Sequence, residues 1–163
     1  MEYSFKNPTC GLLKGTDFLD ELVNYLRRQP EQSYLLTVGT DSCQLKDCSS
    51  FVSVVAIQRL GHGGRYFWNR FYRRKFKALR PRIYTEAEQS LKLATELTKD
   101  LENRLEKIPD QFNIDWEIHV DIGSNGPTRD MINEIVGMIR GSGYTVRTKP
   151  EAYCAAVVAD RHV

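Results

Sequence analysis

The sequence predicts an α/β fold in which helices flank a mixed β-sheet, and three observations support this prediction. Three segments with strand character follow one another closely between residues 34 and 73. Helical and strand patterns then alternate up to residue 148. The chain has 163 residues, 41% of them hydrophobic, which suits one globular domain. Three antiparallel strands followed by α-β-α-β is typical of a mixed sheet with helices on its faces.

The first half of the predicted sheet is a set of neighbouring strands. Residues 34–41 (YLLTVGTD) are mostly apolar, as in a central strand that is buried on both faces. After a polar loop over residues 42–50, residues 51–60 are rich in β-branched side chains. The glycine-rich turn at 61–64 lets residues 65–73 return as a third strand.

The second half of the sequence predicts two helical crossovers between parallel strands. Apolar residues recur every three or four positions from Ile83 to Leu105, which predicts a long helix after Pro81 that Pro109 closes. Residues 116–123 (WEIHVDIG) alternate as a strand does, and Gly126-Pro127 opens a helix that Gly141 ends. A short strand over 144–148 and a helix of small residues from Glu151 complete the chain. Right-handed crossovers place 116–123 beside 34–41 and parallel to it.

Acidic side chains lie where these elements end. Asp41 and Asp121 occupy the carboxyl ends of two strands that we expect to be parallel neighbours. Glu86 lies in the first turn of the predicted long helix, and Asp160 lies near the end of the last helix. Four carboxylates suit Mg²⁺ or Mn²⁺ better than zinc. Two such ions can activate water and stabilise the leaving oxygen in phosphodiester cleavage.

Two alternatives accompany this interpretation. A single Asp at a strand end is often only a turn or cap residue, so the set of four carries the argument and no one member does. Glu88 competes with Glu86 as the helix ligand. We prefer Glu86 because Glu88 precedes Leu91 by three residues and so lies closer to the predicted buried stripe.

Four segments resemble a known family. They are TVGTDS (37–42), RIYTEAEQSLKLA (82–94), HVDIGSNGPTRDMINEIVGMIRGSGY (119–144) and VADRHV (158–163), and they resemble the YkuK-type ribonuclease H-like family of bacterial proteins. The match runs from about residue 34 to 163, and HVDIGSNGPTR is its most specific part. The resemblance implies a five-stranded mixed sheet flanked by helices, with an acid cluster that binds Mg²⁺ or Mn²⁺. By motif, Asp41, Glu86, Asp121 and Asp160 match the family's acids, and Asp160 is the loosest match. The family is known mainly as a predicted nuclease branch without an established substrate.

The segment before the match is treated as an extension. Residues 1–33 form an N-terminal extension, and residues 34–163 form the ribonuclease H-like domain. The extension carries one amphipathic helix over 16–29, with Thr16 as its N-cap and Pro30 as its stop. This helix can cover the sheet or mediate dimerisation to a homo-oligomer, and the sequence leaves both open.

Positive charge is concentrated in one stretch. Residues 65–82 hold eight Lys and Arg, six aromatic residues and no acid, so the remaining chain has 15 basic and 21 acidic residues, a net charge of −6. Such a stretch beside a metal site can neutralise phosphates, which predicts RNA, DNA or hybrid as a partner. The residues assigned to this contact are Arg70, Arg73, Arg74 and Lys75. The alternative is a strand with inward rings and a solvated cationic face.

Further candidates surround the predicted site. Ser124, Asn125 and Arg129 follow Asp121 at a helix N-terminus, where free N–H groups can hold a phosphate or merely form a turn. His119 and His162 can support the metal ligands. The plainer interpretations are a sheet-face residue for His119 and a frayed terminus for His162.

The remaining features bound the function. The four cysteines lack C-x-x-C spacing, which favours reduced thiols, although Cys43 and Cys48 could pair on oxidation. No signal pattern and no run of about 18 apolar residues is present, so we expect a cytoplasmic protein without a membrane partner. The leading hypothesis is a metal-dependent nuclease or phosphodiesterase. The alternative is a nucleic-acid-binding or protein-interaction module without turnover, and a small-molecule phosphatase fits the extended basic stretch less well.

Overall fold

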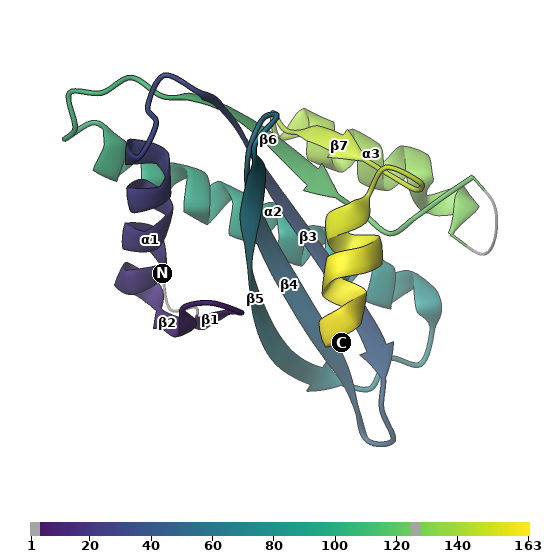
Figure 1. The fold of residues 1–163 in the computed structure, drawn as a ribbon. Coiled ribbons are helices and arrows are strands. Elements are labelled where there is room, and N and C mark those ends of the chain that lie inside the picture. Colours follow the sequence, from purple (N-terminus) through teal and green to yellow (C-terminus); the bar gives the residue numbers. More distant parts are fainter. Residues whose placement is uncertain (1–3, 125–127) are drawn as a thin grey trace.

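A seven-stranded mixed sheet runs through the molecule (Figure 1). The structure, a computed structural model, describes residues 4–124 and 128–163. The strand order is β2-β1-β5-β4-β3-β6-β7. The strands are β1 (Ser4–Asn7), β2 (Gly11–Lys14), β3 (Ser33–Gln44), β4 (Cys48–Arg59), β5 (Gly63–Arg74), β6 (Asn113–His119) and β7 (Thr145–Arg147). β3, β4 and β5 are antiparallel neighbours, and β6 is parallel to β3 and to β7. The predicted mixed sheet and its parallel β3–β6 pair are confirmed.

The sheet has two more strands than the five that the sequence predicts. A hairpin of β1 and β2 extends the sheet at the β5 edge, where Lys6 is registered with Trp68. The Oδ1 atom of Asn7 accepts hydrogen bonds from the backbone N–H groups of Thr9 and Cys10, which closes the hairpin. Each strand has only four residues, too few for an alternating pattern to be recognised in the sequence.

Helices cover one face of the sheet and form the larger core. They are α1 (Gly15–Arg27), α2 (Leu79–Leu105) and α3 (Ile132–Gly141), with a 3₁₀ turn, η1 (Arg129–Met131), before α3. The apolar residues that predicted the N-terminal helix (Phe18, Leu19, Leu22, Val23 and Leu26) are all buried in this core. The helix therefore covers the sheet, which is the first of its two predicted roles.

The C-terminal helix covers the other face. It comprises a π-helix, η2 (Cys154–Ala159), and a 3₁₀ turn, η3 (Asp160–His162), and crosses in front of β3 and β4 (Figure 1). Its small residues pack on Val52, Val54 and Ala56 of β4. The crossing requires glycine in β3, because a Cβ at Gly39 would lie 2.8 Å from the backbone nitrogen of Ala155.

Several element boundaries differ from those predicted. α2 begins at Leu79 and contains Pro81, because a proline in the first turn lacks only an N–H that would have no helical partner. Glu86 therefore lies in the third turn and not in the first, so the positive helix end does not explain its position. β6 ends at His119, which leaves Asp121 in the loop beyond the strand. The predicted helix start at 126–127 lies outside the described residues.

No helix in residues 4–124 and 128–163 combines the length and the apolar content that a membrane span requires.

Candidate metal centre

Asp41 occupies the last part of β3, on the face that the C-terminal helix covers. It is registered with Val52 of β4 and lies two residues after Gly39, so both point to the same side. The pKa of the Asp41 carboxyl is raised from 3.8 to about 6. Burial is the largest cause, and the charges of Asp121 and Asp160 add to it, while a backbone hydrogen bond from Ser42 and the charge of Arg82 lower the pKa. Asp41 is therefore a carboxylate whose ionisation other acids oppose.

Glu86 projects from α2 toward the end of β3. Its side chain is buried, and Oε1 accepts a hydrogen bond of 2.5 Å from the Ser42 hydroxyl. The pKa of Glu86 is raised from 4.5 to about 8, mainly by burial. The hydrogen bond from Ser42 and the charge of Arg82 lower the pKa, and the charges of Asp41 and Asp121 raise it. Ser42 in turn accepts from Arg82, so Arg82 and Ser42 hold the carboxyl in place. Glu88 is exposed on the other side of the helix.

Asp121 lies in the loop after β6. The Nζ atom of Lys149 is 3.0 Å from its Oδ1, an ion-pair distance, but the geometry is not that of a hydrogen bond. Oδ1 is buried and has no hydrogen-bond partner among the described residues. The ammonium of Lys149 offsets the charge of this oxygen, so a metal ion that binds Oδ1 must displace Lys149 or share the oxygen with it.

Asp160 begins η3 and is exposed. Its charge reaches Asp41 and contributes to the raised pKa of that carboxyl. The four predicted acids are therefore linked electrostatically, with Asp41 at the centre of the group.

The four acids of the described chain are not arranged as a complete set of ligands around one point. Within residues 4–124 and 128–163, no three His, Cys, Asp or Glu side chains are placed so that they could hold a metal ion. The donors nevertheless fit a hard cation, because they are carboxylate oxygens and Asp41 and Glu86 are destabilised in their charged forms. The role of the four acids as ligands stays a prediction.

Three residues at this site were not predicted to be there. Ser42 and Arg82 hold Glu86, and Lys149 contacts Asp121. Arg82 belongs to the basic stretch, and its sequence position does not distinguish it from the exposed members. Lys149 lies in the loop after β7, 28 positions from Asp121, and no local pattern joins the two.

The two histidines have structural contacts. His119 is buried, its Nδ1 accepts the N–H of Cys154 at 3.2 Å, and its Nε2 lies 3.2 Å from Glu117. Burial lowers the pKa of His119, so a neutral ring connects β6 to the C-terminal helix. The ring of His162 stacks on Trp68 with centroids 4.4 Å apart, so the chain end is docked. Among the described residues, neither ring forms a hydrogen bond or ion pair with any of the four acids.

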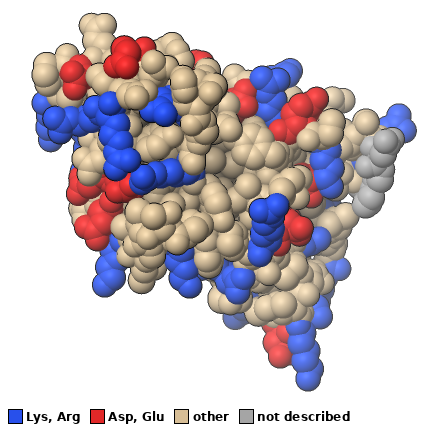
Figure 2. All heavy atoms as spheres, in the orientation of Figure 1, with Lys and Arg blue, Asp and Glu red and all other residues tan. Residues whose placement is uncertain are grey.

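The predicted nucleic-acid residues are mostly on the surface. Arg70, Arg73, Arg74 and Lys75 are exposed, as are Ser124 and Arg129, while Asn125 lies outside the described residues. The aromatic residues of the stretch are divided: Phe67 is fully buried and Tyr72 is 55% exposed. Figure 2 shows the side of the molecule on which the C-terminal helix crosses the sheet. Lys and Arg side chains lie around the lower part of this view, next to an area of uncharged residues. Their role in binding stays a prediction.

Comparison with known proteins agrees with this architecture. The ribonuclease H-like family matches residues 17–163, and the chain belongs to that family. Within it, the chain is similar to the uncharacterised protein YkuK of Bacillus subtilis (strain 168), with 30% identity over 171 aligned positions that cover 98% of this chain and 96% of the relative. The YkuK-type resemblance is therefore confirmed. No solved structure matches the chain significantly.

Proposed function

We propose that this protein is a nuclease or phosphodiesterase that acts on nucleic acid and depends on Mg²⁺ or Mn²⁺. The observation that carries the proposal is the electrostatic linkage of Asp41 with Glu86, Asp121 and Asp160, from four separate elements. Like charges that are brought together in a partly buried place destabilise one another unless a cation or protons offset them. The ribonuclease H-like family makes a nuclease-type function the natural candidate.

The chain's own residues have distinct roles in this proposal. Asp41, Glu86, Asp121 and Asp160 would hold the cations, which supply Lewis-acid stabilisation of phosphate charge and polarise the attacking water. Ser42 and Arg82 keep Glu86 directed at the site. Because the pKa of Glu86 is raised to about 8, its carboxyl must release a proton before it can act as a ligand at neutral pH. Lys149 must leave Asp121 or share it with the metal, and where it leaves, its Nζ is free to contact a phosphate.

The basic surface supports nucleic acid as the substrate class. Lys and Arg side chains on β5 and in the loop after it are exposed. In the sheet, β5 is separated from β3 by one strand, β4. Cations in an extended arrangement neutralise successive phosphates, whereas a small phosphate ester needs only one focused site.

Cleavage assays test the proposal. Labelled RNA, DNA and hybrid substrates are incubated with the wild-type protein and Mg²⁺, Mn²⁺ or a chelator. We expect metal-dependent cleavage that Asp41→Asn reduces at least about a hundredfold, because this variant removes the charge at the centre of the acid group. Glu88→Gln is the control, since it removes an exposed carboxylate on α2 that is not part of the acid group. Equal activity of Asp41→Asn and wild type would remove the catalytic proposal.

A binding module without turnover is the second candidate. The Lys149–Asp121 contact favours it, because a lysine can neutralise the acid without any metal. Salt-sensitive nucleic-acid binding without cleavage, in any of the three metal conditions, would support this candidate.

A further inference from the structure

A surface pocket lies where the N-terminal hairpin meets β5. It is a hollow of about 350 Å³, with Lys6 and Leu12 on the hairpin side and Trp68, Arg70 and Tyr72 on β5. Among residues 4–124 and 128–163, no acidic side chain lines it. We call this hollow the β1–β5 pocket. Its lining residues do not include any of the four acids, and its hairpin side comes from the N-terminal segment before residue 34.

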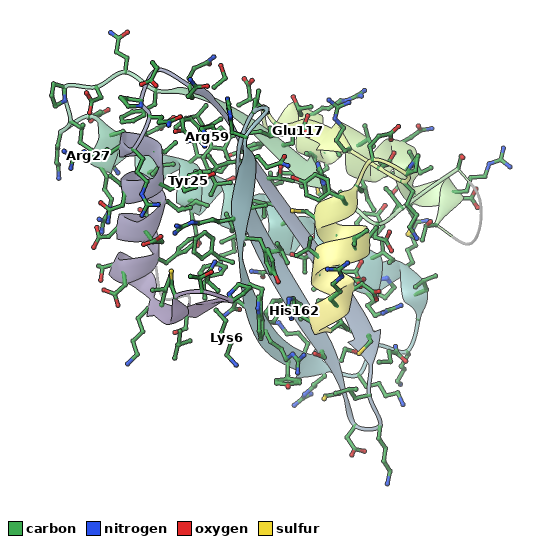
Figure 3. All side chains as sticks on the ribbon, in the orientation of Figure 1. Lys6, Tyr25, Arg27, Arg59, Glu117 and His162 are labelled. Atoms are coloured by element: carbon green, nitrogen blue, oxygen red, sulfur yellow. The ribbon has the colours of Figure 1, made fainter. Side chains whose placement is uncertain are left out.

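The pocket presents aromatic surface beside positive charge. The Tyr72 ring is 55% exposed and Leu12 is 58% exposed, so both leave apolar area in contact with water. The Trp68 ring is partly covered, because His162 stacks on it and Lys6 Nζ lies 5.0 Å from its centroid. Figure 3 shows Lys6 and His162 next to each other in the lower part of the molecule. Tyr72 is therefore the ring that is open to a ligand.

The two cations of the pocket are available to an anion. The Arg70 guanidinium donates to the carbonyl oxygen of His162, which holds it at the pocket. Neither Lys6 nor Arg70 forms an ion pair with an acid among the described residues. A ligand with a flat π-face and a negative charge fits such a site, and a nucleotide has both.

The pocket is aligned with Asp41 across the sheet. Asp41 is registered with Val52, and Val52 is registered with Arg70, so the three side chains form one row on the same face. Two strand spacings of about 4.8 Å separate Arg70 from Asp41, roughly 10 Å in all. Val52 itself is buried under the C-terminal helix, so a strand whose phosphodiester lies at Asp41 must pass around this helix to place a nearby nucleotide at the pocket.

We infer that the β1–β5 pocket is a subsite for one unpaired nucleotide of a single-stranded nucleic acid. The base stacks on Tyr72, and Lys6 and Arg70 neutralise the adjacent phosphate. A base that stacks on a protein ring must be free of its partner strand, so the pocket selects single-stranded segments. The placement of the neighbouring phosphodiester at Asp41 rests on the proposed function, whereas binding at the pocket does not.

Binding is measured in the Asp41→Asn background, which blocks cleavage. Fluorescence anisotropy follows fluorescein-labelled oligothymidylate and oligouridylate, with blunt duplexes of the same length for comparison. We expect tighter binding of the single strands, and Tyr72→Ala weakens it about 5-fold or more, the lower end of the range for stacking of one base. Tyr72→Phe keeps the ring and retains the affinity. Lys6→Ala lowers the slope of log affinity against log salt by about 0.7.

Lys99→Ala is the matched charge control, because Lys99 is exposed on α2. It removes one positive charge away from the pocket and leaves the affinity within about twofold of its parent. Tyr72 is exposed, so its replacement leaves the core intact, and an unchanged thermal midpoint verifies this. Equal affinity of Tyr72→Ala and its parent, preference for duplex, or no single-strand binding would each refute the subsite.

The two proposals fail in different ways. Cleavage by the wild type together with unchanged binding of Tyr72→Ala refutes the subsite and keeps the nuclease. Tyr72-dependent binding without any cleavage supports the subsite and refutes the nuclease.

Discussion

Replacing Glu86 by Gln removes a buried carboxyl group that the fold holds in its protonated form. The pKa of Glu86 is raised from 4.5 to about 8, mainly by burial. A raised pKa means that the folded chain binds the proton more tightly than the unfolded chain. This contribution to stability is fully present below pH 4.5 and is lost as the pH rises through about 8. The metal-free wild type therefore becomes less stable between about pH 5 and pH 8.

The size of this effect follows from the two pKa values. Each pH unit between them changes the free energy of unfolding by up to about 1.4 kcal/mol. The full interval amounts to on the order of 3–5 kcal/mol, and water that enters the site reduces it. Glu86→Gln keeps the shape of the side chain and its contact with Ser42, so it should be more stable than wild type at pH 8 and similar at pH 5. Asp41, whose pKa is raised to about 6, adds a smaller decline that ends at lower pH.

Urea denaturation across this pH range, in the presence of a chelator, measures the effect. Glu88→Gln, which removes an exposed carboxyl from the same turn of α2, should follow the wild-type curve. Added Mg²⁺ should stabilise wild type more at pH 8 than at pH 5, because a cation favours the ionised carboxylates. If Glu86→Gln loses stability with pH as steeply as wild type, Glu86 is not protonated in the fold and the reasoning fails.

Three further predictions concern the surroundings of the site. Gly39→Ala should lower stability by about 1–3 kcal/mol, because the new Cβ would meet the Ala155 backbone at 2.8 Å; an unchanged thermal midpoint would show that the C-terminal helix does not pack on β3 as described. Lys149→Met should tighten Mg²⁺ binding, measured by calorimetry, up to about fivefold, since it removes a half-exposed cation from Asp121; weaker binding would mean that Lys149 assists the metal. His119→Ala should cost about 2–3 kcal/mol in urea denaturation through the lost bond to Cys154 and the cavity, while His62→Ala, at an exposed turn, should cost nothing measurable.

Much of the sheet could be predicted because its signals are local. The apolar run before Asp41 and the alternation before Asp121 identified β3 and β6, and the crossover rule made them parallel neighbours, as the register of Thr37 with Glu117 shows. The choice of Glu86 over Glu88 agrees with the structure, but the reason given for it was wrong. Glu88 was expected closer to the buried stripe of the helix, whereas Glu86 is buried and Glu88 is on the surface. The hairpin of β1 and β2 was missed because each strand is too short to show a period.

The contents of the site could be predicted only in part. Asp41 and Asp121 were expected to be near each other from their places at the ends of adjacent strands. The contacts of Lys149 with Asp121 and of Ser42 with Glu86 depend on loops and helices meeting in space. His162 was expected to fray, but its stacking on Trp68 joins residues that are 94 positions apart.

Apart from the N-terminal hairpin, the sequence by itself determined the order of strands and helices, and it placed Asp41 near the end of a strand and Asp121 just beyond another. These properties depend on side chains a few positions apart, so one segment is enough to read them. Only the tertiary structure decided which acids are buried, which cation stands beside Asp121, and that a pocket with an open aromatic ring forms between the hairpin and β5. Burial and charge are set by neighbours in space, and in this fold those neighbours come from distant parts of the chain.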